Sequence, residues 1–424
     1  MIALIVCAVV GLASCAQRPA EPAPAALPVS QIPDLGLGPR DDIDAADLAV
    51  SPQGEIHVVW RAVVRKADGA TPEYPVLYLR GERGGQTWGR PVEVDRLGEP
   101  PRVALASGKV HVLFGPKLRH FLGDGRTFRE LAPRVPAGRA RALSFDVLPL
   151  GEDLLVAYLL EASSGGLELH VSRDGGPDRT VARFPASFLS QPEPRLAAEG
   201  GRLYLLCAVN LEEGSEPGAD EPFAKVLFLS SADGGATWTE PVEAARGHVA
   251  QAVALIPRQG ALHAFYSAFG LWSTRSADGR SWSAPVAVAP YSTTQARGST
   301  ESGPVVGSPG PDGGFVAWID ARFRKSDRRW WNPLGGVPWS DDNPFWANND
   351  VFALPLDGIA RAPLRRLTPP LSSARSLRAA VIDGRTILLW AGRLEVGKDP
   401  GASGRPPALF YTTYPGSPAG AGSP

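Results

Sequence analysis

The most regular pattern in the chain is an apolar segment that follows a glycine and usually ends in a large apolar or aromatic residue. Examples are GEIHVVW at residues 54–60 and GKVHVLF at residues 108–114. Its seven copies, some of them loose, begin at Gly54, Gly108, Gly151, Gly201, Gly260, Gly314 and Gly384. The copies start roughly 55 residues apart, so the pattern predicts seven units of one strand-rich module.

Further apolar segments surround most copies in a fixed order. One precedes the glycine, as at residues 102–105, and two follow it, as at residues 76–79 and 90–94. Such short segments with turn residues between them are typical of β-strands. Because one small sheet cannot bury both of its faces, the units must stack around an axis. The sequence therefore predicts an all-β fold, a β-propeller of seven four-stranded blades, with six blades as the alternative.

The last unit is predicted to be completed by the other end of the chain. It stops near Tyr414 without an outer strand, and residues 31–35 are placed to supply that strand and close the ring. The propeller is thus expected to form one domain over residues 31–415, followed by a disordered tail at residues 416–424.

The N-terminus is predicted to be an export signal, residues 1–14, followed by an Ala/Pro-rich tether at residues 15–30. The apolar run at residues 2–12 is too short to cross a bilayer. Leu-Ala-Ser-Cys at residues 12–15 resembles the lipobox of bacterial lipoproteins, and this resemblance implies lipidation of Cys15. We expect a lipid anchor in the cell envelope, in the outer membrane or facing the periplasm. An ordinary secretory signal with an incidental cysteine is the alternative.

Charge and residue spacing argue against several classes of partner and cofactor. Lys and Arg number 43 against 44 Asp and Glu, giving a net charge of -1 without a basic patch for nucleic acid, and the lipid anchor is the only membrane contact that we expect. His57, His111 and His263 occupy the same position in three units, hence in separate sheets, so no metal site is predicted. Neither a phosphate loop nor any other cofactor motif is present, and Cys207 reads as a buried hydrophobe.

A second motif lies between the third and fourth strands of the units. Ser231-Ala-Asp-Gly-Gly-Ala-Thr-Trp238 matches the Asp box, Ser-x-Asp-x-Gly-x-Thr-Trp, and partial copies occur at residues 84–88, 124–128, 172–176 and 276–282. On these residues the chain resembles the Asp-box propellers of the sialidase-like superfamily over roughly residues 31–415. The resemblance implies that the Asp boxes lie on the face away from any active site.

A binding site is therefore expected on the opposite face, where chains enter the inner strands and join second to third strands. The longest loop there, residues 322–350, contains Trp330, Trp331 and Trp339 beside arginines and aspartates. Tryptophan rings with charged groups suit sugar recognition. A loop that packs its aromatics against one another is the alternative.

The resemblance to sialidases implies three arginines for a substrate carboxylate, an acid/base Asp and a Tyr activated by Glu. The candidates by position are Arg141, Arg195 and Arg378 for binding, and Glu301, Tyr291 and Asp42, or its neighbour Asp44, for catalysis. Two main functions stay open. One is an envelope propeller that binds a glycan or a protein through its loop face, and the other is an exo-α-sialidase-type glycoside hydrolase. A scaffold for envelope assembly is a third possibility.

Overall fold

The computed structural model of the chain describes most of the predicted propeller. The described residues are 29–66, 69–135, 141–162, 165–174, 176–185, 191–216, 221–268, 270–290, 305–308, 314–320, 350–357, 359, 365–368, 374–382, 385–392 and 406–414. Within them every regular element is a β-strand. No helix in this part of the chain is long and apolar enough to cross a membrane.

The first four blades follow one another in sequence order. Blade 1 contains β2 (Asp42–Val50), β3 (Ile56–Val63), β4 (Val76–Glu82), the short β5 (Thr87–Trp88) and β6 (Val92–Asp95). Blade 2 contains β7 (Arg102–Ala106), β8 (Lys109–Phe114), β9 (Arg119–Gly123) and β10 (Phe128–Leu131). Blade 3 contains β11 (Ala142–Leu150), β12 (Asp153–Glu161), β13 (Leu167–Arg173) and β14 (Arg179–Phe184). Blade 4 contains β15 (Arg195–Glu199), β16 (Arg202–Leu211), β17 (Phe223–Ser231) and β18 (Val242–Gly247).

The remaining three blades complete the ring. Blade 5 contains β19 (Ala252–Arg258), β20 (Ala261–Ser267), β21 (Gly270–Ser276) and β22 (Val286–Pro290). Blade 6 contains β23 (Val305–Ser308), β24 (Phe315–Asp320), β25 (Asp350–Pro355) and β26 (Arg365–Arg366). Blade 7 contains β27 (Arg375–Ile382), β28 (Arg385–Gly392), β29 (Ala408–Tyr414) and β1 (Ser30–Gln31).

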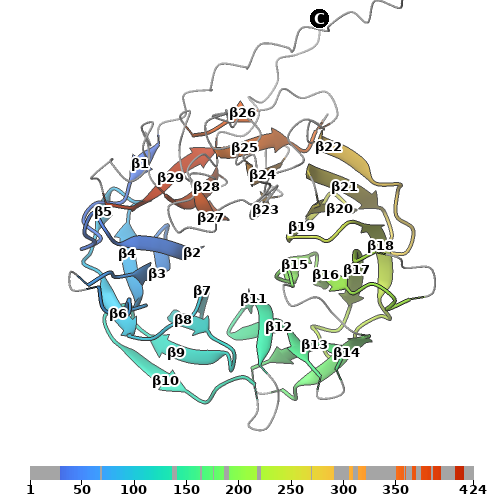
Figure 1. Cartoon of the computed structure of the whole chain (residues 1–424), viewed down its shortest axis with the longest axis horizontal. Helices are drawn as coiled ribbons and strands as arrows, with labels where there is room; N and C mark the ends of the chain where they lie inside the picture. Colours follow the sequence, from blue (N-terminus) through green and yellow to red (C-terminus); the bar gives the residue numbers. More distant parts are fainter. Residues whose placement is uncertain are drawn as a thin grey trace, which may run out of the picture.

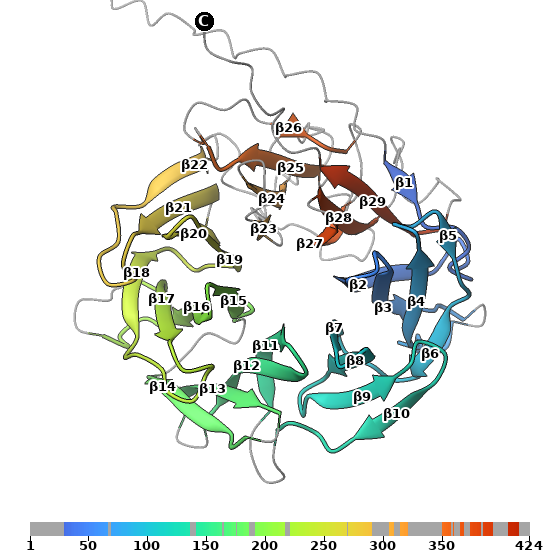
Figure 2. The ribbon, with the colours of Figure 1, turned by 180° about the vertical axis from the view of Figure 1, so that it is seen from behind.

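Each blade is an antiparallel sheet (Figure 1). In blades 1 to 6 the strands run in sequence order from the centre of the ring outward, whereas in blade 7 the N-terminal β1 lies outermost, next to β29. In blade 1 both β5 and β6 pair with β4, so the outer edge of that blade is split between two short strands. The view from behind shows the same closed circle (Figure 2). The chain is a seven-bladed β-propeller, which confirms the predicted fold class and number of blades.

The ring is closed by the N-terminal strand, as predicted. Ser30 pairs with Tyr411 and Gln31 with Phe410, in antiparallel register. The Ile32 amide extends this ladder by donating to the Leu409 carbonyl at 2.8 Å. The strand begins one residue earlier than expected and pairs over a shorter stretch, because the chain leaves the sheet edge after Ile32.

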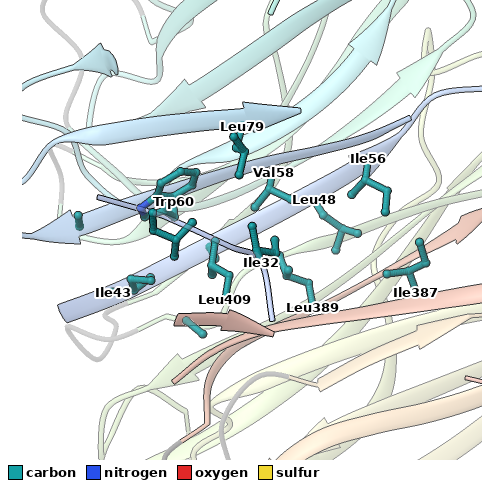
Figure 3. Packing of buried hydrophobic residues seen from close by; sticks show 14 residues of the cluster. Ile32, Ile43, Leu48, Ile56, Val58, Trp60, Leu79, Ile387, Leu389 and Leu409 are labelled. Atoms are coloured by element: carbon teal, nitrogen blue, oxygen red, sulfur yellow. The ribbon is translucent and has the colours of Figure 1, made fainter. Parts of the chain in front are cut away.

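The hydrophobic core is divided into seven clusters in the described residues, one between each pair of neighbouring blades. Alternate residues of one strand enter different clusters: Val58 and Trp60 of β3 face blade 7, whereas Val59 faces blade 2. Successive side chains of a strand point to opposite faces of its sheet. The second strands are therefore largely apolar, which is why the repeated segment gave so clear a signal. Figure 3 shows the cluster at the closure, where Ile32 packs near Leu409 and Leu389.

The two faces of the ring differ in their turns. The Gly84 amide in the turn after β4 donates to the Gly54 carbonyl in the turn after β2, so both turns lie on one face. In the corresponding turn of blade 4, residues 231–238, Asp233 accepts hydrogen bonds from the Thr237 amide at 2.9 Å and the Thr237 hydroxyl at 2.6 Å. The Trp238 indole donates to the Gly235 carbonyl. The inner strands begin on the opposite face, and the candidate site lies there.

Candidate functional site

Three arginines from three separate blades converge on one carboxylate near the centre of the ring. Arg102 is the first residue of β7, Arg195 the first of β15, and Arg378 lies within β27. Glu193 precedes β15, and its Oε2 lies 2.8 Å from Arg195 Nη2, 3.4 Å from Arg378 Nη2 and in contact with Arg102 Nη2. These inner strands border the centre of the ring in Figure 1. We call this set the arginine cluster.

Two aspartates complete the charge balance of the arginine cluster. Asp47 Oδ1 lies 3.1 Å from Arg378 Nε and 3.7 Å from Arg102 Nη1. Asp146 Oδ1 lies 3.7 Å from Arg195 Nη1 and 3.9 Å from Arg102 Nε. The arginine cluster therefore contains three arginines and three carboxylic acids.

Both aspartates are also bound to the backbone of the next blade. Asp47, on β2 of blade 1, accepts a hydrogen bond from the Val103 amide at 2.8 Å. Asp146, on β11 of blade 3, accepts one from the Leu196 amide at 2.9 Å. In both cases an arginine immediately precedes the donating residue. The same device thus occurs twice: an aspartate in one inner strand binds an Arg-apolar pair at the start of the next.

Burial and mutual charge set the ionisation of the cluster. The Arg102 side chain is only 4% exposed, that of Asp47 10%, that of Asp146 15%, and that of Glu193 35%. Burial alone would raise the pKa of Glu193, but the surrounding arginines Arg102, Arg378 and Arg195 hold it well below its usual value. Burial and the charge of Arg102 lower the pKa of Arg378 to about 10. Arg102, Arg378 and Glu193 are therefore charged at neutral pH.

The segment that carries Glu193 is fixed by its neighbours. The Ser144 hydroxyl donates to the Pro192 carbonyl at 3.0 Å. The Gln191 side chain donates to the Asn210 carbonyl and accepts from the Asn210 amide. Asn210 in turn exchanges two hydrogen bonds with the backbone of Ala250 in the chain entering blade 5. These contacts hold the backbone at residues 191–193 while leaving the Glu193 side chain against the arginines.

Two of the predicted binding arginines belong to the cluster and one does not. Arg195 and Arg378 both contact Glu193. Arg141 is exposed just before β11, and the third arginine on Glu193 in the described structure is Arg102. Of the predicted acids, Asp42 accepts a hydrogen bond from Arg375 at 2.6 Å.

Asp44 is also engaged in an ion pair. It accepts from Arg61 Nε at 2.9 Å, so this carboxylate is held by an arginine of its own blade. Tyr291, Glu301, Trp330, Trp331, Trp339 and the lipidation candidate Cys15 lie outside the described residues.

The sequence reasoning missed Arg102, Glu193, Asp47 and Asp146. A signal for the first was present, because Arg-Val-Ala at residues 102–104 and Arg-Leu-Ala at residues 195–197 occupy the same place in two units. Acidic residues at 47 and 146, inside inner strands that are otherwise largely apolar, were a second signal. Glu193 stands in a loop, and nothing in its local sequence distinguishes it.

The repeated histidines serve local contacts in separate blades. His57 Nδ1 lies 2.7 Å from the Tyr78 hydroxyl, and His111 Nδ1 lies 2.9 Å from His120 Nε2. Among the described residues no group of three or more His, Cys, Asp or Glu side chains is arranged to hold a metal ion. Burial raises the pKa of the Cys207 thiol to about 12, so this thiol is protonated and unreactive at neutral pH.

No protein-family model and no curated protein matches the chain. Among solved structures, a protein of unknown function from Dyadobacter fermentans aligns at 13% identity over 91% of this chain and 98% of that one, with a TM-score of 0.49. The Penicillium chrysogenum α-L-arabinanase complexed with arabinobiose aligns at 13% identity over 92% and 99%, with a TM-score of 0.44.

A third solved structure is the Trypanosoma rangeli sialidase in complex with sialic acid. It aligns at 14% identity over 88% of this chain and 54% of that one, with a TM-score of 0.44. The chain thus spans about half the length of that sialidase. The strand pairing of this chain by itself shows the seven-bladed fold.

Proposed function

We propose that the protein is an exported, lipid-anchored propeller of the bacterial cell envelope, with Asp-box turns on one face, that binds an acidic glycan through the other. The observation that supports this most is the convergence of Arg102, Arg195 and Arg378 on a single carboxylate. Planar guanidinium groups pair with the two oxygens of a carboxylate through parallel hydrogen bonds. Three of them on inner strands form a receptor for a carboxylate-bearing sugar.

Binding can be tested with the purified mature chain and a matched pair of sugars. Sialyllactose carries a carboxylate and lactose does not, so calorimetry should detect the first and not the second. Arg195→Gln should weaken binding at least tenfold, which is about 1.4 kcal/mol for one charge-assisted contact. Arg202→Gln, an exposed arginine at the start of β16, serves as the control. Equal binding of both sugars, or of neither, would contradict the proposal.

The second candidate is an exo-acting glycoside hydrolase of the sialidase type. It is favoured by the same convergence, because a sialidase holds the substrate carboxylate with three arginines. The catalytic roles would fall to Tyr291 and Glu301 with Asp42 as the acid/base. The test is release of a fluorescent leaving group from a sialoside analogue, and that activity should disappear in Glu301→Gln. Binding without release would leave the binding protein as the function.

The lipid anchor has its own test. In a bacterial host, the chain should incorporate an alkyne-labelled fatty acid and sediment with membranes. Cys15→Ser should abolish both properties if Cys15 carries the lipid. Unchanged membrane association in Cys15→Ser would show that the protein is secreted or held by another contact.

A further inference from the structure

We propose that Glu193 is a built-in competitor for this site: its side chain occupies the place of a ligand carboxylate, and a ligand binds by exchanging with it. The identification of the natural ligand as an acidic glycan rests on the proposed function. The carboxylate exchange itself does not depend on which glycan the protein binds.

The charge balance of the cluster favours exchange of one carboxylate for another over addition of a fourth carboxylate. Arg102, Arg195 and Arg378 are already matched by Glu193, Asp47 and Asp146. A further carboxylate would leave a net negative charge among side chains that are mostly buried. Burying an uncompensated charge in a protein is strongly unfavourable. A ligand carboxylate therefore enters most readily when one resident carboxylate leaves for solvent.

Glu193 is the carboxylate that can leave. Asp47 and Asp146 lie within β-strands and accept backbone hydrogen bonds from the neighbouring blade, so moving either one would break the contact between blades. The Glu193 carboxylate contacts the three arginines, and its side chain is the most exposed of the three acids, at 35% against 10% for Asp47 and 15% for Asp146.

The movement needed is a rotation of one side chain. The backbone on either side is held by the Ser144–Pro192 hydrogen bond and by the pairing of β15 with β16. Glutamate rotates about its side-chain bonds on a picosecond to nanosecond scale when exposed. The arginines can stay in place, each still close to a second acid, Asp47 or Asp146, while the occupant of the shared position changes.

The exchange also defines the ligand class. A monocarboxylate replaces Glu193 with no change in net charge, and its two coplanar oxygens fit the guanidinium forks. A divalent anion such as sulfate would add a second negative charge beside Asp47 and Asp146. The site is therefore expected to prefer monocarboxylates, including the acid group of a sialic or uronic sugar.

The test removes the competitor and supplies a small substitute. Glu193→Ala leaves room for a free carboxylate and should be stabilised by formate in a saturable way, seen as a rise in melting temperature. The formate concentration that gives half of the maximal rise in melting temperature should be at least tenfold lower for Glu193→Ala than for the wild type. Glu199→Ala, at the end of β15, the strand that follows Glu193, is the matched variant, and acetamide and sulfate are the control solutes. The proposal is overturned if formate acts equally on both variants, or if acetamide or sulfate acts as well as formate on Glu193→Ala.

A second variant covers the case in which Glu193→Ala unfolds. If that variant is unfolded in buffer, formate should restore its folded signal, and failure at every concentration counts against the proposal. Glu193→Gln keeps the volume of the side chain but removes the competing charge. It should bind sialyllactose at least tenfold more tightly than the wild type. Rescue by formate without any glycan binding would retain the exchange site and reject the proposed glycan, so the two ideas fail separately.

Discussion

His120 is buried between two groups that disfavour its positive charge. Its Nε2 lies 2.9 Å from His111 Nδ1, and Arg134 Nη2 donates to its Nδ1 at 3.3 Å. The Arg134 guanidinium also contacts Asp174, whose other oxygen accepts from the Leu154 amide at the start of β12. Burial first, then the charges of Arg134 and His111, lower the pKa of His120 to about 3. The ring is thus neutral in the folded protein.

This arrangement predicts acid destabilisation with a defined sign. The pKa of a histidine in the unfolded chain is about 6.5, so between that pH and about 3 only the unfolded chain takes up the proton. His120 should contribute full stability above pH 6.5 and lose about 1.4 kcal/mol per pH unit below it.

Urea unfolding of His120→Gln at several pH values between 7 and 4 measures this contribution. As the pH falls, the free energy of unfolding should decrease less steeply for His120→Gln than for the wild type. Glutamine can make both hydrogen bonds without taking up a proton. His248→Gln, at an exposed position, is the control. The same pH slope in His120→Gln and the wild type would show that His120 does not stay neutral in the fold.

Gly279 shows the cost of a single methyl group in a turn. Its φ is +72°, and a Cβ there would come within 2.5 Å of Phe228 Cε1. Gly260 has a similar φ of +76°, but a Cβ there would meet nothing within 4 Å. Gly260→Ala should cost about 1 kcal/mol for the left-handed backbone, and Gly279→Ala about 3 kcal/mol because crowding is added. Equal losses in thermal unfolding would mean that the turn can move away from Phe228.

At the scale of single residues, the sequence indicated which arginines lie on inner strands better than it indicated which side chains meet at the site. Arg195 and Arg378 were found from their place at inner strands, and the copy at Arg102 was visible as the same Arg-apolar-Ala pattern. Glu193 could not be found, because a loop glutamate looks the same whether it faces solvent or three arginines.

Among the elements, the second strand of each blade was the most predictable. β3, β8 and β16 are packed on both faces by neighbouring blades, so nearly every position is apolar and the glycine turn before each one marks its start. The outer strands were less predictable, because they are short and one face is solvated. β5 and β26, with two residues each, are examples.

The closing strand β1 gains its stability from one side chain more than from its length. It pairs through Ser30 and Gln31, while Ile32 beside it is 1% exposed in the cluster that contains Leu389 and Leu409. Ile32→Ala should destabilise the protein by about 3 kcal/mol, as expected for a large-to-small change in a packed core.

Chemical denaturation of Ile32→Ala checks this prediction, with Val381→Ala as the control. Val381 lies on β27 of the same blade and is 45% exposed, so its truncation should cost less than about 0.5 kcal/mol. A loss of similar size in both variants would mean that the N-terminal strand does not contribute to closure.

At the scale of the whole molecule, the candidate site exists only because the ring closes. Glu193 lies 91 positions from Arg102 and 185 from Arg378, and residues of β2, β7, β11, β15 and β27 meet around it. Each strand was predictable from its own pattern. Which residues of the inner strands lie at the same level along the central axis depends on the tilt and register of every blade. No single segment of the sequence encodes these, so the convergence of the side chains could not be predicted.

A double-mutant cycle between Arg102 and Glu193 tests this convergence most directly. Arg102→Gln, Glu193→Gln and the double variant are compared by urea unfolding, with Arg102 and Glu199 as the control pair. Contacting charges in one network should give a coupling free energy of about 1–3 kcal/mol, whereas the control pair should be additive within about 0.5 kcal/mol. Additivity between Arg102 and Glu193 would contradict the account, because two residues of different blades that meet in a closed ring cannot act independently.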